Sequence, residues 1–254
     1  MRRRLLALAR GGAAPIVLLM LLEAYARGPG AGSDALAAPS AAMLALTGAL
    51  LDGSLLQGTA FTLGSAATGL AIALVTGTLL GIWLGLSRRA AAWSFLTVEV
   101  LRPIPSVALI PLSMLVFGFG LRMETAVVAF AVFWPMLILA QAAARQVDPR
   151  LLEVALALGL SPVARIAKIV VPAMVPRLFV ALRLGVAIAL VVAVTVEIAA
   201  NPHGMGYAMM VAQQSLDPAL MLAWLFWIAV VGYAINALAL RLERWVARAM
   251  GVAP

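Results

Sequence analysis

The sequence predicts an all-α membrane protein with about six transmembrane helices. The first observation is composition: 65% of the residues are hydrophobic, only 11% are charged, and the mean hydropathy is +1.08. That apolar share exceeds the share found in soluble domains. The second is that the apolar runs are continuous rather than alternating, which favours helices over barrel strands. A chain of 254 residues has room for these spans and short loops, so residues 1–254 are expected to form a single transmembrane domain.

Basic residues fix the predicted topology. Of 18 arginines and lysines, 16 fall on segments assigned to the cytoplasm or its boundary, and only Arg27 and Arg122 lie outside. This bias follows the positive-inside rule and predicts that both termini are cytoplasmic. The net charge of +8 is therefore interpreted as membrane topology and not as nucleic-acid binding. The predicted spans are 11–26, 58–86, 104–120, 124–144, 178–200 and 219–240.

The N-terminus allows two interpretations. Arg2–Arg4 and Arg10 precede an apolar run from Gly11 to Leu22. A basic region followed by a short apolar region is typical of a cleaved secretory signal, but a retained first span has the same pattern. Charge does not separate the two, because either one leaves the following segment outside.

The second span carries a stripe of small residues. Gly77, Gly81 and Gly85 recur every four residues, which places them on one face of a helix. Such a stripe lets another helix approach closely. We expect this packing to occur within the chain, and a seam between subunits is the alternative.

Three prolines interrupt the third span. Pro103, Pro105 and Pro111 each lack a backbone donor and prevent a smooth helix. Within a membrane, broken backbone is tolerated only against protein or a watery cavity. This segment, with Pro105, Ser106 and Pro111, is therefore a candidate wall of a transport pathway, and a structural kink is the alternative. The preceding segment, 87–102, contains three arginines and is expected to be cytoplasmic.

The segment 148–176 is a polar island between long apolar runs. Asp148, followed by a proline, is typical of a helix start, and apolar residues then recur at helical spacing. Gly159 fits the left-handed turn that ends such a helix. Ser161 precedes another proline and restarts a second helix, which is expected to end near Pro172 and Pro176. The prediction is two short helices joined by a glycine elbow.

These residues carry a family resemblance. Glu153-Val154-Ala155, Gly159 and the later Ile169-Val170-Val171-Pro172 resemble the cytoplasmic EAA coupling loop of permease subunits in binding-protein-dependent ABC importers. Two further stretches, Leu101–Gly120 and Gly204-Met205-Gly206-Tyr207, resemble the nitrate, sulfonate and taurine branch of that family. The resemblance implies the type I importer (MetI-like) permease fold in a multi-pass protein of the bacterial inner membrane, and it favours a retained first span.

The resemblance also implies partners: a second permease copy, two cytoplasmic ATPase chains and an extracytoplasmic solute-binding protein. The chain itself is expected to be a transporter subunit and no enzyme, with an aspartyl or serine enzyme of the membrane as the alternative. Its sole lysine follows an alanine, which excludes a phosphate-binding GxxxxGK[ST] loop, so a separate chain is expected to hydrolyse ATP. Contact with anionic lipid is the alternative role of the basic residues in the loop. The residues implied to couple to the ATPase are Glu153, Ala155, Gly159, Ser161, Arg165, Lys168, Ile169 and Pro172.

Few residues offer other chemistry. Cysteine is absent and His203 is the only histidine, so no metal site, cofactor or catalytic group is expected. Glu197 lies toward the end of the fifth span, where an acid should face protein or water. It either bonds to a neighbouring helix end or lines the pathway.

The resemblance thus predicts a permease that imports a small anion such as nitrate, an alkanesulfonate or taurine. A thiamine-precursor pyrimidine is the alternative within the same importer class. A stand-alone secondary carrier or channel is a second alternative, which would require more ionisable residues inside the membrane than this sequence has.

Overall fold

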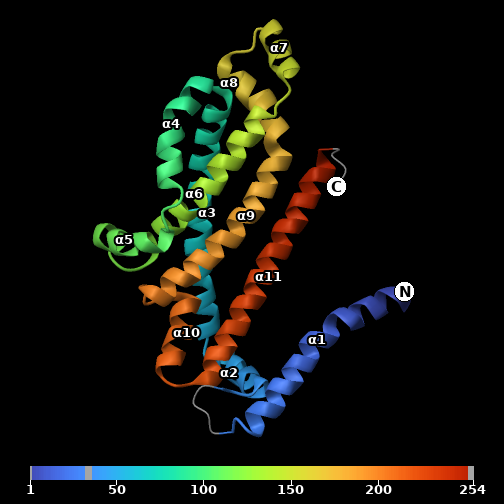
Figure 1. Ribbon diagram of the computed structural model, residues 1–254, viewed down its shortest axis with the longest axis vertical. Helices are drawn as coiled ribbons and strands as arrows, with labels where there is room; N and C mark the ends of the chain where they lie inside the picture. Colours follow the sequence, from blue (N-terminus) through green and yellow to red (C-terminus); the bar gives the residue numbers. More distant parts are fainter. Residues whose placement is uncertain (1, 32–35, 251–254) are drawn as a thin grey trace.

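The computed structural model describes residues 2–31 and 36–250, and these form helices and connecting turns without a strand (Figure 1). The side chains of 2–12 and of residue 15 are outside this description. The helical elements are α1 (Arg2–Arg27), α2 (Pro39–Leu51), α3 (Ser54–Leu86), α4 (Arg88–Leu101), η1 (Ser106–Leu109), α5 (Ile110–Phe117), α6 (Leu121–Arg145), α7 (Pro149–Ala157), α8 (Pro162–Arg165), η2 (Ile166–Val170), α9 (Val171–Ala199), α10 (Gly204–Gln214) and α11 (Pro218–Ala249).

Four helical units of the described chain are long and apolar enough to cross a membrane: α3, α6, α11 and the continuous helix Pro162–Ala199. The pair formed by α4 and the η1–α5 segment meets the same criteria together but is bent by 83°. α1 covers the predicted first span and is not among these units, so a sixth span stays a prediction. Figure 1 places α7 and α8 at the end of the molecule opposite α2 and α10, as the predicted topology requires.

The centre of the fold is the contact between α3 and α6. A Cβ atom on Gly77 would lie 2.8 Å from Met136 Cβ, and one on Gly81 would lie 2.7 Å from Ala140 Cβ. Glycine therefore sets how closely these helices approach, which confirms that the stripe packs within the chain. We call this contact the glycine seam; it consists of Gly69, Gly77, Gly81 and Gly85 and the α6 residues that they contact. The seam continues into an apolar core to which α9 also contributes.

The segment before the proline-rich stretch is helical. The Ser87 side chain accepts a hydrogen bond from the Ala90 N–H, and α4 follows, running alongside α3 (Figure 1). The expected interruption by the prolines is present, because α4 ends before Pro103 and the next α-helix, α5, is only eight residues long. The bent pair therefore begins well upstream of the span predicted over 104–120.

The second helix of the coupling segment also differs from its prediction. It does not end near Pro172 and Pro176 but runs through both prolines into α9. The π-helical turn η2 precedes them, and in it the Val171 N–H bonds to the Ile166 carbonyl. A wider turn accommodates a proline ring that would otherwise clash with the preceding turn. The loop is thus one short helix and the first part of a long one.

Candidate functional site

The coupling segment is built by local hydrogen bonds. Asp148 Oδ1 accepts from the Arg150 N–H at 2.9 Å and starts α7. Gly159 ends it with φ of 69°, and its N–H donates to the Leu156 carbonyl at 2.9 Å. The Ser161 hydroxyl oxygen accepts from the Ala164 N–H at 3.2 Å and starts α8. The predicted helix start, glycine elbow and second helix start are all confirmed.

One residue of this segment is anchored while most of the others are free. Ala155 is fully buried, and Leu152 of the same helix packs against the apolar cluster that includes Val170 and Met174. Leu158 is 70% exposed and Val163 77% exposed, although both are aliphatic. An exposed apolar surface of this kind marks a contact with protein or membrane. Of the other residues that the resemblance implies, Glu153, Gly159, Ser161, Lys168 and Pro172 are exposed, and Arg165 and Ile169 are half-buried.

Glu197 lies at the opposite end of α9 and is fully buried. Its Oε1 accepts from the Thr62 hydroxyl at 2.6 Å, and its Oε2 accepts from the Gly206 N–H at 2.8 Å. The Thr62 oxygen in turn accepts from the Met205 N–H at 3.0 Å. Of the two roles considered for Glu197, the bond to a neighbouring helix end is the one that this structure contains.

A second buried acid, which the sequence reasoning missed, completes this network. Glu124 is fully buried near the start of α6 and accepts hydrogen bonds from the Ser65 hydroxyl and from Asn201 Nδ2, the latter at 2.5 Å. These hydrogen bonds connect α3, α6 and α9. We call the group the outer polar network; it consists of Thr62, Ser65, Glu124, Glu197, Asn201 and the start of α10. An acid one turn inside an apolar run was the signal that could have indicated it.

The same network explains the Gly204-Met205-Gly206 motif. Gly204 has φ of 92°, and a Cβ there would overlap the Glu197 carboxyl group. A Cβ on Gly206 would collide with the Val194 carbonyl oxygen and the Glu197 side chain. Both glycines therefore allow the start of α10 to lie directly against α9.

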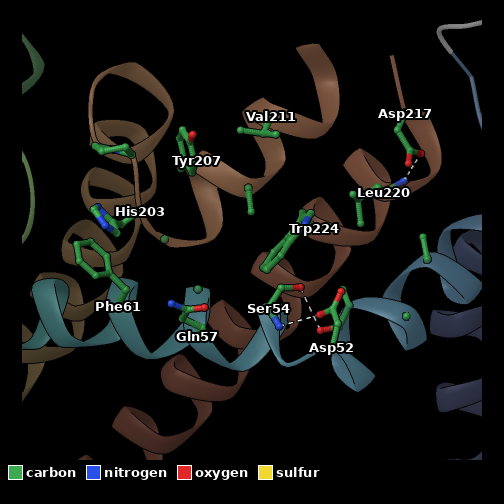
Figure 2. Close-up of a pocket in the computed structure, with 17 residues that line it drawn as sticks. Asp52, Ser54, Gln57, Phe61, His203, Tyr207, Val211, Asp217, Leu220 and Trp224 are labelled. Carbon is green, nitrogen blue, oxygen red and sulfur yellow. Dashed lines mark hydrogen bonds between the residues drawn. The ribbon is translucent and has the colours of Figure 1, made fainter. Parts of the chain in front are cut away.

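An outer cavity of about 630 Å³ lies between α2, α3, α10 and α11 (Figure 2). The ring of His203 stacks on Phe61 at its edge, with ring centroids 5.0 Å apart. Two carboxylates line it, and both are engaged: Asp52 accepts from the Ser54 N–H at 2.8 Å and Asp217 from the Leu220 N–H at 2.9 Å. Hydrogen bonding from the Ser54 side chain and backbone lowers the pKa of Asp52.

A second cavity, of about 320 Å³, adjoins the proline-broken segment. Of the candidate pathway residues, Ser106 lines it, whereas Pro105, Pro111 and Glu197 do not. The membrane cavity, as we call it, is lined by Arg102, Ile104, Ser106, Phe130, Ala131, Trp134, Pro135, Ile138, Ile188 and Val192.

Comparison with known proteins identifies the family. Residues 77–252, which include the coupling segment and the motif before α10, match the family described as binding-protein-dependent transport system inner membrane component. This chain belongs to that family. It is a multi-pass inner-membrane subunit of an ABC importer and is not itself an enzyme.

The relatives are permeases of several systems. The chain is 30% identical over 195 residues to the putative aliphatic sulfonates transport permease protein SsuC of Bacillus subtilis, covering 77% of this chain and 71% of that one. It is 27% identical over 199 residues to the taurine transport system permease protein TauC of Escherichia coli, covering 77% and 72%. Its fold is similar to that of a chain of the inward-facing MetNI methionine ABC transporter, with a TM-score of 0.65, 20% identity and coverage of 74% and 94%.

Proposed function

We propose that this permease forms half of the translocation pathway for a small anion, in an importer with two copies of this chain, two ATPase chains and a solute-binding protein. The relatives named for sulfonates and taurine, together with others named for bicarbonate and nitrate, support this substrate class. The exposed apolar surface of the coupling segment supports the ATPase contact, because packing within the chain does not account for it and it lies in the loop that resembles the coupling loop of the family; contact with lipid is the alternative.

The coupling segment transmits motion as a rigid unit. α8 continues through the π turn into α9, so a force on the exposed tip is carried directly into a membrane helix. Closure of the ATPase pair on ATP would tilt α9 and exchange inward for outward access. The residues proposed to couple are Glu153, Ala155, Gly159, Ser161, Arg165, Lys168, Ile169 and Pro172, with Ala155 acting as the anchor.

Gly159 provides the test. A Cβ at this position would meet nothing within 4 Å inside the chain, so the space around it is free for a partner. We expect Gly159→Asp to leave membrane insertion intact but to reduce recovery of the ATPase with the purified permease by about tenfold or more, and to uncouple transport from ATP hydrolysis. Co-purification and ATP-driven uptake in proteoliposomes measure this.

Gly53→Asp is the matched control. Gly53 also has a positive φ, of 81°, and open space where a Cβ would lie, but it is at the other end of the molecule. Any backbone strain caused by aspartate is thus shared by the two variants, whereas the ATPase contact is not. Equal retention of the ATPase by both variants would contradict the proposed docking surface.

A further inference from the structure

The membrane cavity combines hydrogen-bond donors with an apolar wall. Arg102 contributes a guanidinium group with five N–H donors, and Trp134 contributes an indole that can only donate. Ser106 adds a hydroxyl group from the other side of the chain break. No aspartate or glutamate is among the described residues that line the cavity. The polar side chains there are thus suited to a ligand that accepts hydrogen bonds.

The indole N–H of Trp134 lacks a hydrogen-bond acceptor among the described residues. Its side chain is 8% exposed, and its indole Nε1 is buried without a hydrogen-bond partner among the described residues. Its known contacts are edge-to-face packing with Phe130 and Phe133, which do not satisfy the N–H. A buried donor without an acceptor is unfavourable, and native proteins contain few of them. The Nε1 atom is closed off in this structure, so a ligand acceptor in the cavity that the Trp134 side chain lines would remove this deficit after a small rotation of the indole.

Arg102 lies at a depth where a charge is unfavourable. The α6 residues that line the cavity, from Phe130 to Ile138, are the middle turns of a helix that spans 121–145 and is apolar enough to cross the membrane. A charged side chain inside a membrane usually marks a pathway or a partner. The carboxylate of Glu99 lies 3.6 Å from one terminal nitrogen of Arg102. The guanidinium group is planar and has several donors, so this single contact leaves others available.

We propose that the membrane cavity is an intramembrane binding station for the transported anion, with Arg102, Trp134 and Ser106 as its donors. The cavity holds a small oxyanion or sulfonate: the guanidinium group of Arg102 pairs with the charge, Trp134 and Ser106 donate to remaining oxygens, and apolar side chains form the rest of the wall. The chain break after α4 is then functional, because it brings Arg102 and Ser106 to the same cavity. This inference rests on the proposed function for its substrate class.

Transport by the complete importer is the first test. Proteoliposomes containing the permease, its ATPase and its binding protein are assayed for ATP-driven uptake of nitrate, bicarbonate, methanesulfonate and taurine. For each anion that the unmodified importer takes up, we expect Arg102→Gln to lower uptake by about tenfold or more. We expect Trp134→Phe, which removes the N–H together with part of the indole ring, to lower it by about threefold. Both variants should retain the ATPase, because neither residue lies in the coupling segment.

Matched controls come from α4. Arg89→Gln removes the same charge from α4, the helix that Arg102 directly follows, and Trp93→Phe changes an indole side chain that is 89% exposed. Neither residue lines the membrane cavity. Uptake by these controls should equal that of the unmodified importer. If Arg89→Gln lowers uptake as much as Arg102→Gln does, the arginines serve lipid contact or topology, and the binding station is overturned. It is also overturned if Trp134→Phe transports normally.

A second measurement does not depend on transport. The chain contains no cysteine, so Ser106→Cys introduces a single thiol at the cavity wall. The assembled complex is treated either with an anionic methanethiosulfonate that bears a sulfonate group or with a cationic one that bears a trimethylammonium group. Mass spectrometry follows the modification of the permease chain. We expect the ratio of anionic to cationic modification rates to fall about fivefold or more when Arg102→Gln is added, and to be unchanged by Arg89→Gln.

The two measurements separate the hypotheses. A complex that takes up none of the four anions refutes the proposed substrate class, while the modification ratio still reports whether the membrane cavity attracts anions. A ratio that does not respond to Arg102→Gln overturns the binding station, even in an importer that transports one of the four anions.

Discussion

The glycine seam between α3 and α6 and the tip formed by α7 and α8 are both composed largely of small and aliphatic residues, but they meet opposite surroundings. Around Gly81, atoms of α6 would lie within 2.9 Å of an added Cβ, including the Leu137 carbonyl oxygen. Around Gly159, the chain leaves open space to 4 Å. The first glycine removes volume so that two helices can touch, and the second supplies a left-handed turn on a free surface.

This difference indicates where stability and function lie in the chain. Substitutions in the seam should affect folding, since packed backbone cannot move aside. Substitutions at the tip should affect assembly, since nothing within the chain depends on the exposed side chains. The outer polar network lies between these cases, because it is buried and closely packed at Gly204 and Gly206 but is also held by hydrogen bonds.

The largest effect is expected in the seam. Gly81→Val would place a branched side chain against α6 backbone and Ala140, at distances from 2.7 Å upward for the first carbon alone. We expect destabilisation at or above the upper end of the about 1–3 kcal/mol that overpacking costs, and much less folded permease after extraction. Gly64→Val is the control on the same helix, because a Cβ there would meet nothing within 4 Å. Equal yields and unfolding midpoints for both variants would show that the seam is not tightly packed.

An intermediate effect is expected in the outer polar network. Glu197→Ala removes the acceptor for the Thr62 hydroxyl and the Gly206 N–H, and an unpaired buried donor costs about 1–3 kcal/mol. Gly204→Ala places its Cβ on the Glu197 carboxyl group. Its cost should therefore be smaller in the Glu197→Ala background, with a coupling of about 0.5–3 kcal/mol in a double-mutant cycle of unfolding. Strictly additive costs would mean that the carboxyl group does not hold α10 in place.

The smallest effect on stability is expected at the tip. Leu158→Ser changes a side chain that is 70% exposed, so its effect on unfolding should stay within about 0.5 kcal/mol. Retention of the ATPase during purification should nevertheless decrease, because the lost apolar surface belongs to the proposed contact. A normal complex yield would place this side chain outside the interface.

Local sequence was sufficient for the two helix starts and the glycine turn of the coupling segment. The Asp148 cap, the Gly159 turn and the Ser161 cap each depend on hydrogen bonds between residues close in the chain. The motif that identifies the family lies within the same segment, so the family could also be predicted. The glycine stripe could also be predicted, because its spacing places the glycines on one face of the helix regardless of which helix packs against them.

Residue types did not decide two other features. The three arginines of segment 87–102 indicated a cytoplasmic position, whereas α4 forms there and brings Arg102 to the membrane cavity. Pro172 and Pro176 indicated a helix end, whereas the π turn carries the helix through them. That proline rule gave way to the bond between the Val171 N–H and the Ile166 carbonyl.

The sequence by itself determined the helical class, the apolar units and the caps, because each follows from periodicity or from bonds within one or two turns. The resemblance of the coupling segment indicated the family. Only the tertiary structure decided that Glu124 and Glu197 share one network, and that Arg102, Ser106 and Trp134 line one cavity. The physical reason is that buried polar groups take partners from whichever helices lie beside them. Thr62 and Glu197 are 135 positions apart in the chain, so no local pattern records that they meet.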